Sequence, residues 1–292
     1  MNNQLFINIL FSFALYLIVS QSFSIKYISS KFFDLTHAVI ITFVAYFTFS
    51  FSQQFDISLL FSIPLAVICV TSIGLLCELC LYKPLRKRNA SPMILMIASL
   101  GLYTILQNCI SMIWGDDTKS IRTGEVKIGH DFLGAYITDI QIVTIIVSLV
   151  LFVCCVLFLK HSRLGRNIRA VSSNSELSNI FGINSNKVVL SAFGIGSLLA
   201  SIAGILVAFD TDMTPTMGFN LLLYGVVAMI IGGVGSNWGL IGGALLLATT
   251  QHLAAYYIGS QWMDAVAYVI LILFLIWKPL GFSGKRLKKV EI

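Results

Sequence analysis

The chain has 292 residues, of which 57% are hydrophobic and 11% charged, with a formal net charge of +6. Soluble domains carry about a quarter charged residues, so this composition excludes an ordinary soluble enzyme. Several apolar windows reach the roughly 20 residues that a bilayer-spanning helix needs. We therefore expect an all-α, polytopic membrane helical bundle.

Hydropathy predicts about eight to nine membrane segments, some of them short or broken. The first is interpreted as a membrane helix and not as a removed signal, since no basic region precedes it and no cleavage pattern follows. The seventh and ninth are short for a full crossing. The expected spans cover residues 5–23, 35–53, 57–82, 92–114, 139–160, 188–209, 219–233, 239–258 and 263–277.

Basic residues gather in three clusters, within residues 83–88, 160–187 and 278–289. Lys26 and Lys31 are assigned to the loop before the second span. Lys and Arg collect on the cytoplasmic side of membrane proteins, so these loops are expected in the cytoplasm. The N-terminus is then outside and the C-terminus inside. The net positive charge is explained by this topology, and no nucleic acid partner is expected.

One long polar segment, residues 161–187, separates two apolar spans. Ser173 and Glu176 match the S-x-x-E capping box that opens a helix, and Gly182 is suited to end it in the left-handed conformation. Basic residues before this helix are expected to contact anionic lipid headgroups. A short helix with defined ends is therefore predicted within this loop.

The predicted helix carries one apolar stripe, formed by Leu177, Ile180 and Phe181 at helical spacing. So short a helix is marginal alone in water, and its stripe needs a partner surface. That surface is either the protein's own membrane domain, the lipid headgroups, or a groove of another protein.

A glycine-rich stretch, residues 230–243, interrupts the seventh span. Irregular backbone at membrane depth is tolerated where it is buried in protein or lines a cavity. Gly239 and Gly243, four apart, are typical of close helix packing, whereas the preceding residues are typical of a turn. Packing and pathway lining both stay open for the candidate residues Gly232, Gly233, Gly235 and Ser236.

Three polar residues within the spans are further pathway candidates. His37 lies near the start of the second span, where a structural hydrogen-bonding role is the main alternative. Gln107 and Asn108 lie deep in the fourth span and need hydrogen-bond partners. They either join neighbouring helices or line a pathway.

The chain carries no motif for an energy source of its own. The phosphate loop G-x-x-x-x-G-K-[ST] is absent, and Glu78 is expected to contact Lys83 or Arg86 at a span edge. Cys77 and Cys80 form C-x-x-C without an accompanying His, so neither a cofactor nor a metal is expected. We therefore do not expect the protein to be an enzyme. It either conducts a solute passively or takes the energy for transport from a partner.

Five blocks in order resemble the branched-chain amino acid ABC transporter permease family, whose uptake systems also include urea and short-amide importers. The blocks are "ELCLYKPLRKRNASPMILMIASLGLYTILQN" (78–108), "SRLGRNIRAVSSNSELSNIFGINSNKV" (162–188), "TPTMGF" (214–219), "GGVGSNWGLIGGALL" (232–246) and "KPLGFSGK" (278–285). The resemblance covers most of the length and implies one transmembrane permease domain over residues 1–292, located in the bacterial inner membrane.

The resemblance also implies partners and a docking site. Permeases of this kind contact ATPase subunits through a cytoplasmic Glu-Ala-Ala-x-x-x-Gly loop; here Glu176 and Gly182 keep that spacing, but both alanines are replaced. A second homologous permease subunit, a periplasmic or surface solute-binding protein and membrane lipids are the other implied partners. The implied cargo is a small amino acid, branched-chain first, with urea or a short amide as the alternative.

Two departures from the family pattern concern candidate pathway residues. Tyr224 stands where the family often has Lys, which puts the accepted solute in question. His37 aligns with the family's Asn-Phe-Ala-His-Gly, but the following Gly has become Ala38. Two other classes of function also stay open: a stand-alone channel for a small neutral solute, and a membrane scaffold without a pore.

Overall fold

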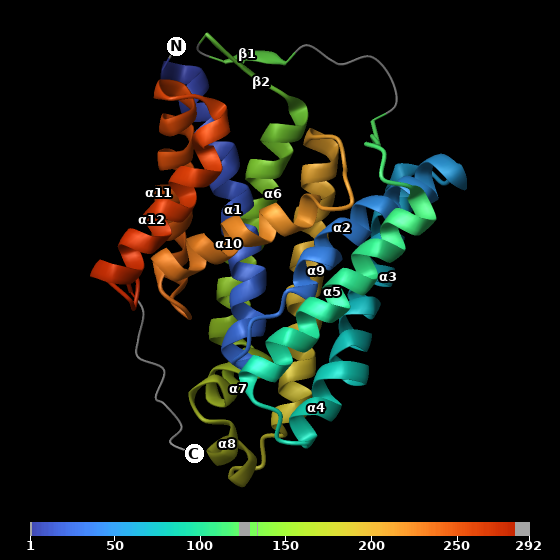
Figure 1. The fold of residues 1–292 in the computed structure, drawn as a ribbon, viewed down its shortest axis with the longest axis vertical. Coiled ribbons are helices and arrows are strands. Elements are labelled where there is room, and N and C mark those ends of the chain that lie inside the picture. The colour runs from blue at the N-terminus through green and yellow to red at the C-terminus, as the bar shows by residue number, and fades with distance from the viewer. Residues whose placement is uncertain (1, 123–128, 133, 284–292) are drawn as a thin grey trace. The chain divides into compact units, whose positions relative to one another are not determined.

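The computed structural model describes residues 2–122, 129–132 and 134–283, which are almost entirely helical (Figure 1). Its two short strands, β1 (His130–Phe132) and β2 (Ala135–Ile137), pair antiparallel. The helices are α1 (Asn2–Ser30), α2 (Thr36–Phe49), α3 (Leu59–Cys77), α4 (Lys83–Lys87), α5 (Pro92–Trp114), α6 (Asp139–His161), α7 (Arg163–Ser173), α8 (Ser175–Ile180), α9 (Ser185–Asp210), α10 (Met217–Gly232), α11 (Asn237–Tyr257) and α12 (Met263–Trp277). The predicted fold class, a polytopic helical membrane bundle, is confirmed.

Among the described residues, six helical stretches are long and apolar enough to cross a membrane. They are Asn3–Ser30, Leu59–Lys87, Pro92–Trp114, Asp139–His161, Ser185–Asp210 and Ser260–Trp277; α10 is apolar but shorter. Each of the nine predicted segments coincides with a helix. The largest boundary error concerns α1, which continues seven residues past the predicted end, so Lys26 lies inside a helix and not in a loop.

Two compact units divide the chain. Of the described residues, the first unit contains 2–21, 129–132, 134–154 and 221–283, and the second contains 22–122 and 155–220. The long helices α1 and α6 contribute to both units, as does α10.

Helix α2 is the central element of the second unit, because α3, α5 and α9 all pack against it. Almost every residue of α2 is buried. Small residues let the backbones approach closely: a Cβ added at Gly204 of α9 would lie 2.2 Å from the carbonyl oxygen of Ile41. Two π-helical segments, Ser50–Gln54 and Glu78–Tyr82, extend α2 and α3.

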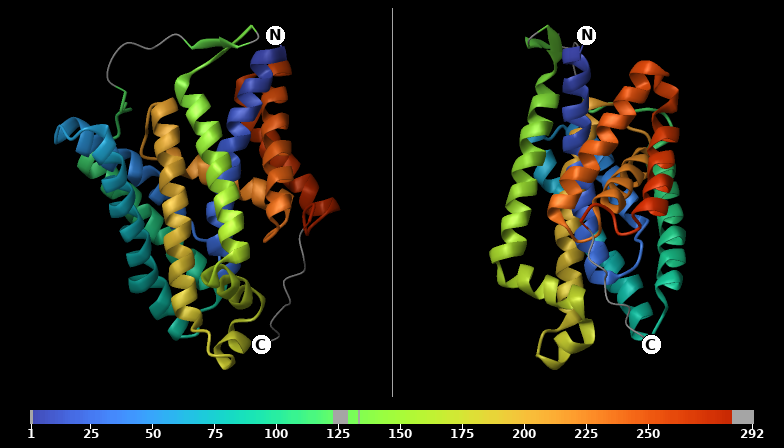
Figure 2. Two further views of the ribbon diagram at one scale, coloured as in Figure 1. Left: turned by 180° about the vertical axis from the view of Figure 1, so that it is seen from behind. Right: turned by 90° about the vertical axis from the view of Figure 1, so that its left-hand side faces the viewer.

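Helices α7 and α8 form a short polar hairpin at the end of the second unit where α9 begins (Figure 2). The basic helix α4 lies at the same end of this unit (Figure 1). The acidic residues Asp116 and Asp212 belong to the opposite end, where Lys119 pairs with Met213 through two backbone hydrogen bonds. The second unit is therefore basic at one end and acidic at the other.

Candidate functional site

The predicted short helix exists as α8, but its N-terminal cap differs from the prediction. Ser173 is the last residue of α7, so its assignment as the cap is wrong. The side-chain oxygen of Asn174 accepts hydrogen bonds from the backbone nitrogens of Glu176 and Leu177, each at 3.0 Å. Asn174 has the extended backbone (φ −156°, ψ 113°) that a cap requires. Glu176 lies in the first turn, where a negative charge interacts favourably with the helix dipole.

The C-terminal end of α8 agrees with the sequence analysis. Gly182 has a φ of 82°, the left-handed conformation expected of a residue that ends a helix. The nitrogen of Ile183 donates to the carbonyl oxygen of Ser178 at 2.9 Å, and the nitrogen of Gly182 donates to that of Asn179 at 3.0 Å. Both ends of this six-residue helix are therefore fixed by hydrogen bonds.

The apolar stripe of α8 points away from the rest of the chain. Leu177, Ile180 and Phe181 are 51%, 78% and 81% exposed. Polar contacts hold the opposite side: Ser185 at the start of α9 donates from its nitrogen and from its hydroxyl to the amide oxygen of Asn179, at 3.0 and 2.8 Å. The helix is thus anchored through polar groups and presents its apolar side chains outward.

Helix α7 was not predicted from the sequence, although Ile168 and Val171 repeat at helical spacing and both are buried. It packs tightly after α6, since a Cβ added at Gly165 would lie 2.5 Å from the carbonyl oxygen of Leu159. The Lys31 ammonium donates to the carbonyl oxygen of Ser172, and burial lowers the pKa of that ammonium. The end of α1 is therefore tied to the end of α7.

A buried polar network joins the end of α1 to the start of α2. Lys26 Nζ lies 3.4 Å from Asp34 Oδ2, and the two side chains are 2% and 3% exposed. Asp34 Oδ1 also accepts hydrogen bonds from the Tyr82 hydroxyl at 2.7 Å and the Thr36 nitrogen at 3.1 Å. This network was not predicted from the sequence, because Lys26 was assigned to a loop and Asp34 was not singled out.

Glu78 begins the π-helical segment that carries Tyr82 into this network. As predicted, it contacts Arg86: both terminal guanidinium nitrogens bind its carboxylate, Nη1 to Oε2 at 3.1 Å. The carboxylate is fully buried. A paired, buried carboxylate of this kind fixes the segment between α3 and α4.

Three predicted pathway residues have ordinary structural surroundings. His37 is fully buried, with Nε2 lying 2.9 Å from the Ser22 hydroxyl. Asn108 is exposed on α5 and donates to the carbonyl oxygen of Thr104 in its own helix at 2.7 Å. Gln107 is half-buried on the same helix. No hydrogen bond joins His37 to either amide among the contacts described.

The glycine-rich stretch combines both features expected of it, a turn and a packed helix pair. Gly233 and Gly235 have φ values of 97° and 82°, which give the sharp turn between α10 and α11. A Cβ added at Gly239 would lie 2.0 Å from the Gly232 carbonyl oxygen, and one at Gly243 would lie 2.0 Å from that of Ala228. These two helices therefore pack backbone to backbone.

The polar groups of this turn also have partners. The Ser236 hydroxyl caps α11 by accepting from the nitrogen of Gly239 at 3.1 Å. The carbonyl oxygens of Ile231 and Gly232 accept from the nitrogens of Phe282 at 2.9 Å and Ser283 at 3.1 Å. Turn geometry and close packing account for the four predicted residues of this stretch.

Tyr224, the remaining candidate, belongs to a polar cluster in the first unit. Its hydroxyl donates to the carboxylate of Asp264 in the first turn of α12. Its ring lies 5.3 Å from the ring of Tyr16, centroid to centroid. In the same unit, the Ser12 hydroxyl lies 2.7 Å from Nε2 of His252. The sequence singled out Tyr224 as a candidate, but not Asp264.

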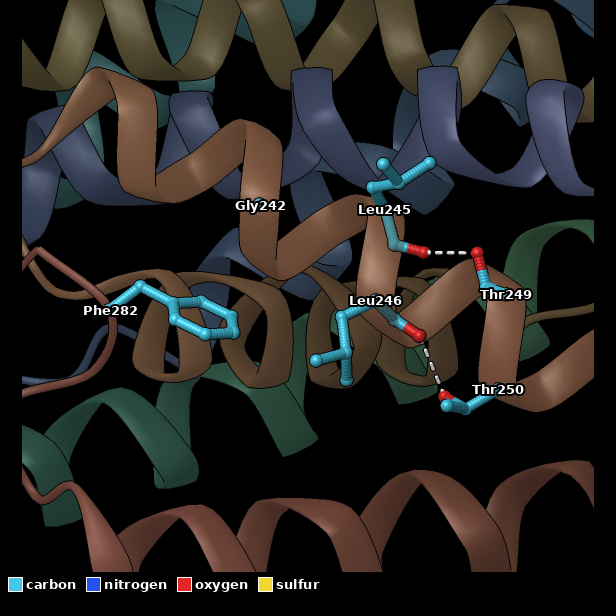
Figure 3. Close-up of a pocket in the computed structure, with 6 residues that line it drawn as sticks. All are labelled: Gly242, Leu245, Leu246, Thr249, Thr250 and Phe282. Carbon is cyan, nitrogen blue, oxygen red and sulfur yellow. Dashed lines mark hydrogen bonds between the residues drawn. The ribbon is translucent and has the colours of Figure 1, made fainter.

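An open cavity of about 420 Å³ in the first unit contains none of the predicted residues (Figure 3). The Thr249 and Thr250 hydroxyls donate to the carbonyl oxygens of Leu245 and Leu246 in their own helix, as Figure 3 shows. The lining of this cavity is therefore mainly apolar, because both hydroxyl protons are already used within α11. The cavity is lined by Gly242, Leu245, Leu246, Thr249, Thr250 and Phe282.

Comparisons with known proteins show which family the chain resembles. The family model described as "Branched-chain amino acid transport system / permease component" matches residues 5–275. The chain is 30% identical over 225 residues to the high-affinity branched-chain amino acid transport system permease protein LivH of Escherichia coli strain K12, covering 75% of this chain and 72% of that protein. For the corresponding protein BraD of Pseudomonas aeruginosa, the identity is 32% and the coverage 75% and 73%. The solved structure of PsaBC from Streptococcus pneumoniae in complex with Fab has a TM-score of 0.52 at 12% identity, covering 92% of this chain and 90% of that one, which supports the fold alone.

Proposed function

Because the chain belongs to the family of branched-chain amino acid transport system permease components, we propose that it is the membrane subunit of an ATP-driven importer. The observation that carries this proposal beyond the family is the exposed stripe of Leu177, Ile180 and Phe181 on a helix with fixed ends. The chain itself performs no chemistry on its cargo. It provides the route across the membrane, and partner subunits provide the energy.

The ATPase-docking site is proposed to be α8 within the loop 161–187. An amphipathic helix that lays its apolar face into a groove is a recurring mode of recognition. Burying Phe181 and Ile180 against a partner contributes roughly 1.5–3 kcal/mol for each fully buried side chain. The caps by Asn174 and Gly182 hold the stripe in place before the partner arrives, which lowers the ordering cost of docking.

The length of α1 supports the proposed orientation. This helix has 29 residues and is about 43 Å long at 1.5 Å per residue, enough to cross the membrane once. Its end is tied to α7 by the contact of Lys31 with Ser172. We assign α4 and α7 to the cytoplasm by their basic residues, and α8 with them because it follows α7 directly; the N-terminus then lies outside. The C-terminus is placed inside by Lys278, since the other basic residues of its cluster lie outside the described residues.

The proposed cargo is a small amino acid, with a branched-chain amino acid as the first candidate and urea or a short amide as the alternative. A solute-binding protein delivers it to the acidic end of the second unit, and a second permease subunit completes the membrane part. Residues 1–292 act as one permease domain. Tyr224 is the predicted pathway residue that this proposal retains, because its cluster is polar and accessible.

The double substitution Leu177→Asp and Phe181→Asp tests the docking assignment. It places two charges on the stripe while leaving the caps and the polar contacts of Asn179 intact. We expect co-purification of the ATPase subunit to be lost, together with ATP-dependent uptake, while the permease still inserts and folds. The matched control, Ser173→Asp with Ser175→Asp, adds the same two charges at exposed positions outside the stripe. Unchanged ATPase association in the Leu177/Phe181 variant contradicts the assignment.

A further inference from the structure

Asp264 is an accessible carboxylate with an unusual set of neighbours. It lies in the first turn of α12, is exposed, and accepts a hydrogen bond from the Tyr224 hydroxyl of α10. Tyr268 lies four residues further along α12, on the same face of the helix. The ring of Tyr16 from α1 packs on the ring of Tyr224. Three helices of the first unit thus contribute tyrosines to one cluster beside an exposed carboxylate.

This carboxylate has no cationic partner among the residues that the structure describes. Lys278 follows the opposite end of α12, about 21 Å away along the helix axis. Its described neighbours are the hydroxyl donor of Tyr224 and the start of α12, where the helix dipole interacts favourably with a negative charge. Ionisable residues within membrane helices are rare, and they commonly mark substrate or ion pathways.

Helix α11 helps to fix the position of Asp264. Gln251 is fully buried there, and its amide nitrogen lies 3.4 Å from the carbonyl oxygen of Met263, the residue before Asp264. Tyr16 is 6% exposed and cannot swing away from Tyr224 without opening the helix contact. The carboxylate is therefore presented in one place by rigid elements, as a binding group must be.

We propose that Asp264, with Tyr224 and Tyr268 beside it, binds the ammonium group of the transported solute. A carboxylate supplies a charge-assisted hydrogen bond to an ammonium, and tyrosine faces attract a cation placed over them. An anion is repelled by the same carboxylate, and a neutral amide gains only an ordinary hydrogen bond. This inference rests on the proposed function and narrows its substrate class: the site favours an amino acid over urea or a short amide.

The test is ligand-detected NMR on the full-length permease in lipid nanodiscs, without partner subunits. The probes are n-butylammonium, butyramide and butyrate, which share a chain and differ in the polar group. We expect saturable binding of butylammonium alone, weakened about tenfold by Asp264→Asn, which corresponds to about 1.4 kcal/mol. Asp264→Glu is expected to restore binding, because it returns the carboxylate. Tyr224→Phe is expected to weaken it by a smaller factor.

Equal binding of the three probes, or equal binding of butylammonium by the parent and Asp264→Asn, overturns the proposal. Gel-filtration profiles in detergent show whether each variant folds, and the Asp264→Glu variant separates loss of the charge from loss of the fold. ATP-dependent uptake by the complete transporter is measured separately. A transporter that imports an amino acid while Asp264→Asn binds butylammonium normally refutes this inference and leaves the proposed function standing.

Discussion

Replacing the charged Lys26 by an uncharged side chain should strongly destabilise the membrane domain. In Lys26→Met, the carboxylate of Asp34 keeps its bonds from Tyr82 and Thr36 but loses the ammonium at 3.4 Å. Both charged side chains are almost fully buried, so the remaining negative charge is uncompensated. Breaking a buried pair in this way costs about 3–5 kcal/mol. The free energy of unfolding in mixed micelles, titrated with a denaturing detergent, measures the loss.

The double variant Lys26→Met with Asp34→Asn separates the charge from the packing. An Asn at position 34 still accepts the bonds from Tyr82 and Thr36, and no charge is left behind. We expect the double variant to lie within about 1 kcal/mol of the parent, since replacing both members of a buried pair is often nearly neutral. The matched control is Arg122→Met, which breaks the exposed Arg122–Asp212 pair at 3.7 Å in the same unit and should cost at most about 1 kcal/mol.

Two outcomes refute this reasoning. If Lys26→Met costs no more than Arg122→Met, Lys26 does not neutralise a buried charge. If the double variant is as unstable as the single one, the loss comes from the packing of the lysine stem, whose Cγ lies within 2.7 Å of a Cβ added at Gly196, and not from electrostatics.

The remaining predictions concern helix packing and the cap of α8. Gly243→Ala should lower the stability of the folded protein by roughly 1–3 kcal/mol, because the added Cβ would lie 2.0 Å from a carbonyl oxygen of α10. The control, Gly101→Ala on the open face of α5, should be neutral or stabilising. Thermal denaturation in detergent compares the two variants, and equal melting temperatures contradict the proposed close packing of α10 and α11. Asn174→Ala should destabilise α8 by about 1 kcal/mol, and Ser173→Ala should destabilise it much less. Amide hydrogen exchange at Glu176 and Leu177 should therefore become faster only in Asn174→Ala. Equal exchange in both variants argues against Asn174 as the cap.

The sequence predicted most of the helices because apolar runs of this length have one solution in a bilayer. It failed at α1 for a physical reason. Hydropathy ends a span at the first cation, but Lys26 is buried with a counter-ion eight residues away, and that pairing is a tertiary fact. The first residues of the predicted loop therefore belong to α1, which continues to Ser30.

In the candidate site as well, local features were predicted from the sequence and features that depend on distant contacts were not. The stripe of α8 and the glycine that ends it are local patterns, so spacing alone predicted them. The choice between Ser173 and Asn174 as cap depended on where α7 ends, which was not visible from the capping pattern. The contact of Asp264 with Tyr224 could not be predicted in this way, because it joins two residues 40 positions apart in the sequence.

The most direct test of the account is flux in proteoliposomes that contain the permease with or without its ATPase, permease and binding-protein partners. With L-leucine as the solute, the complete assembly should accumulate it only when ATP is hydrolysed, and the permease alone should give no flux above empty vesicles. Sustained uptake by the permease alone, without nucleotide, contradicts the account.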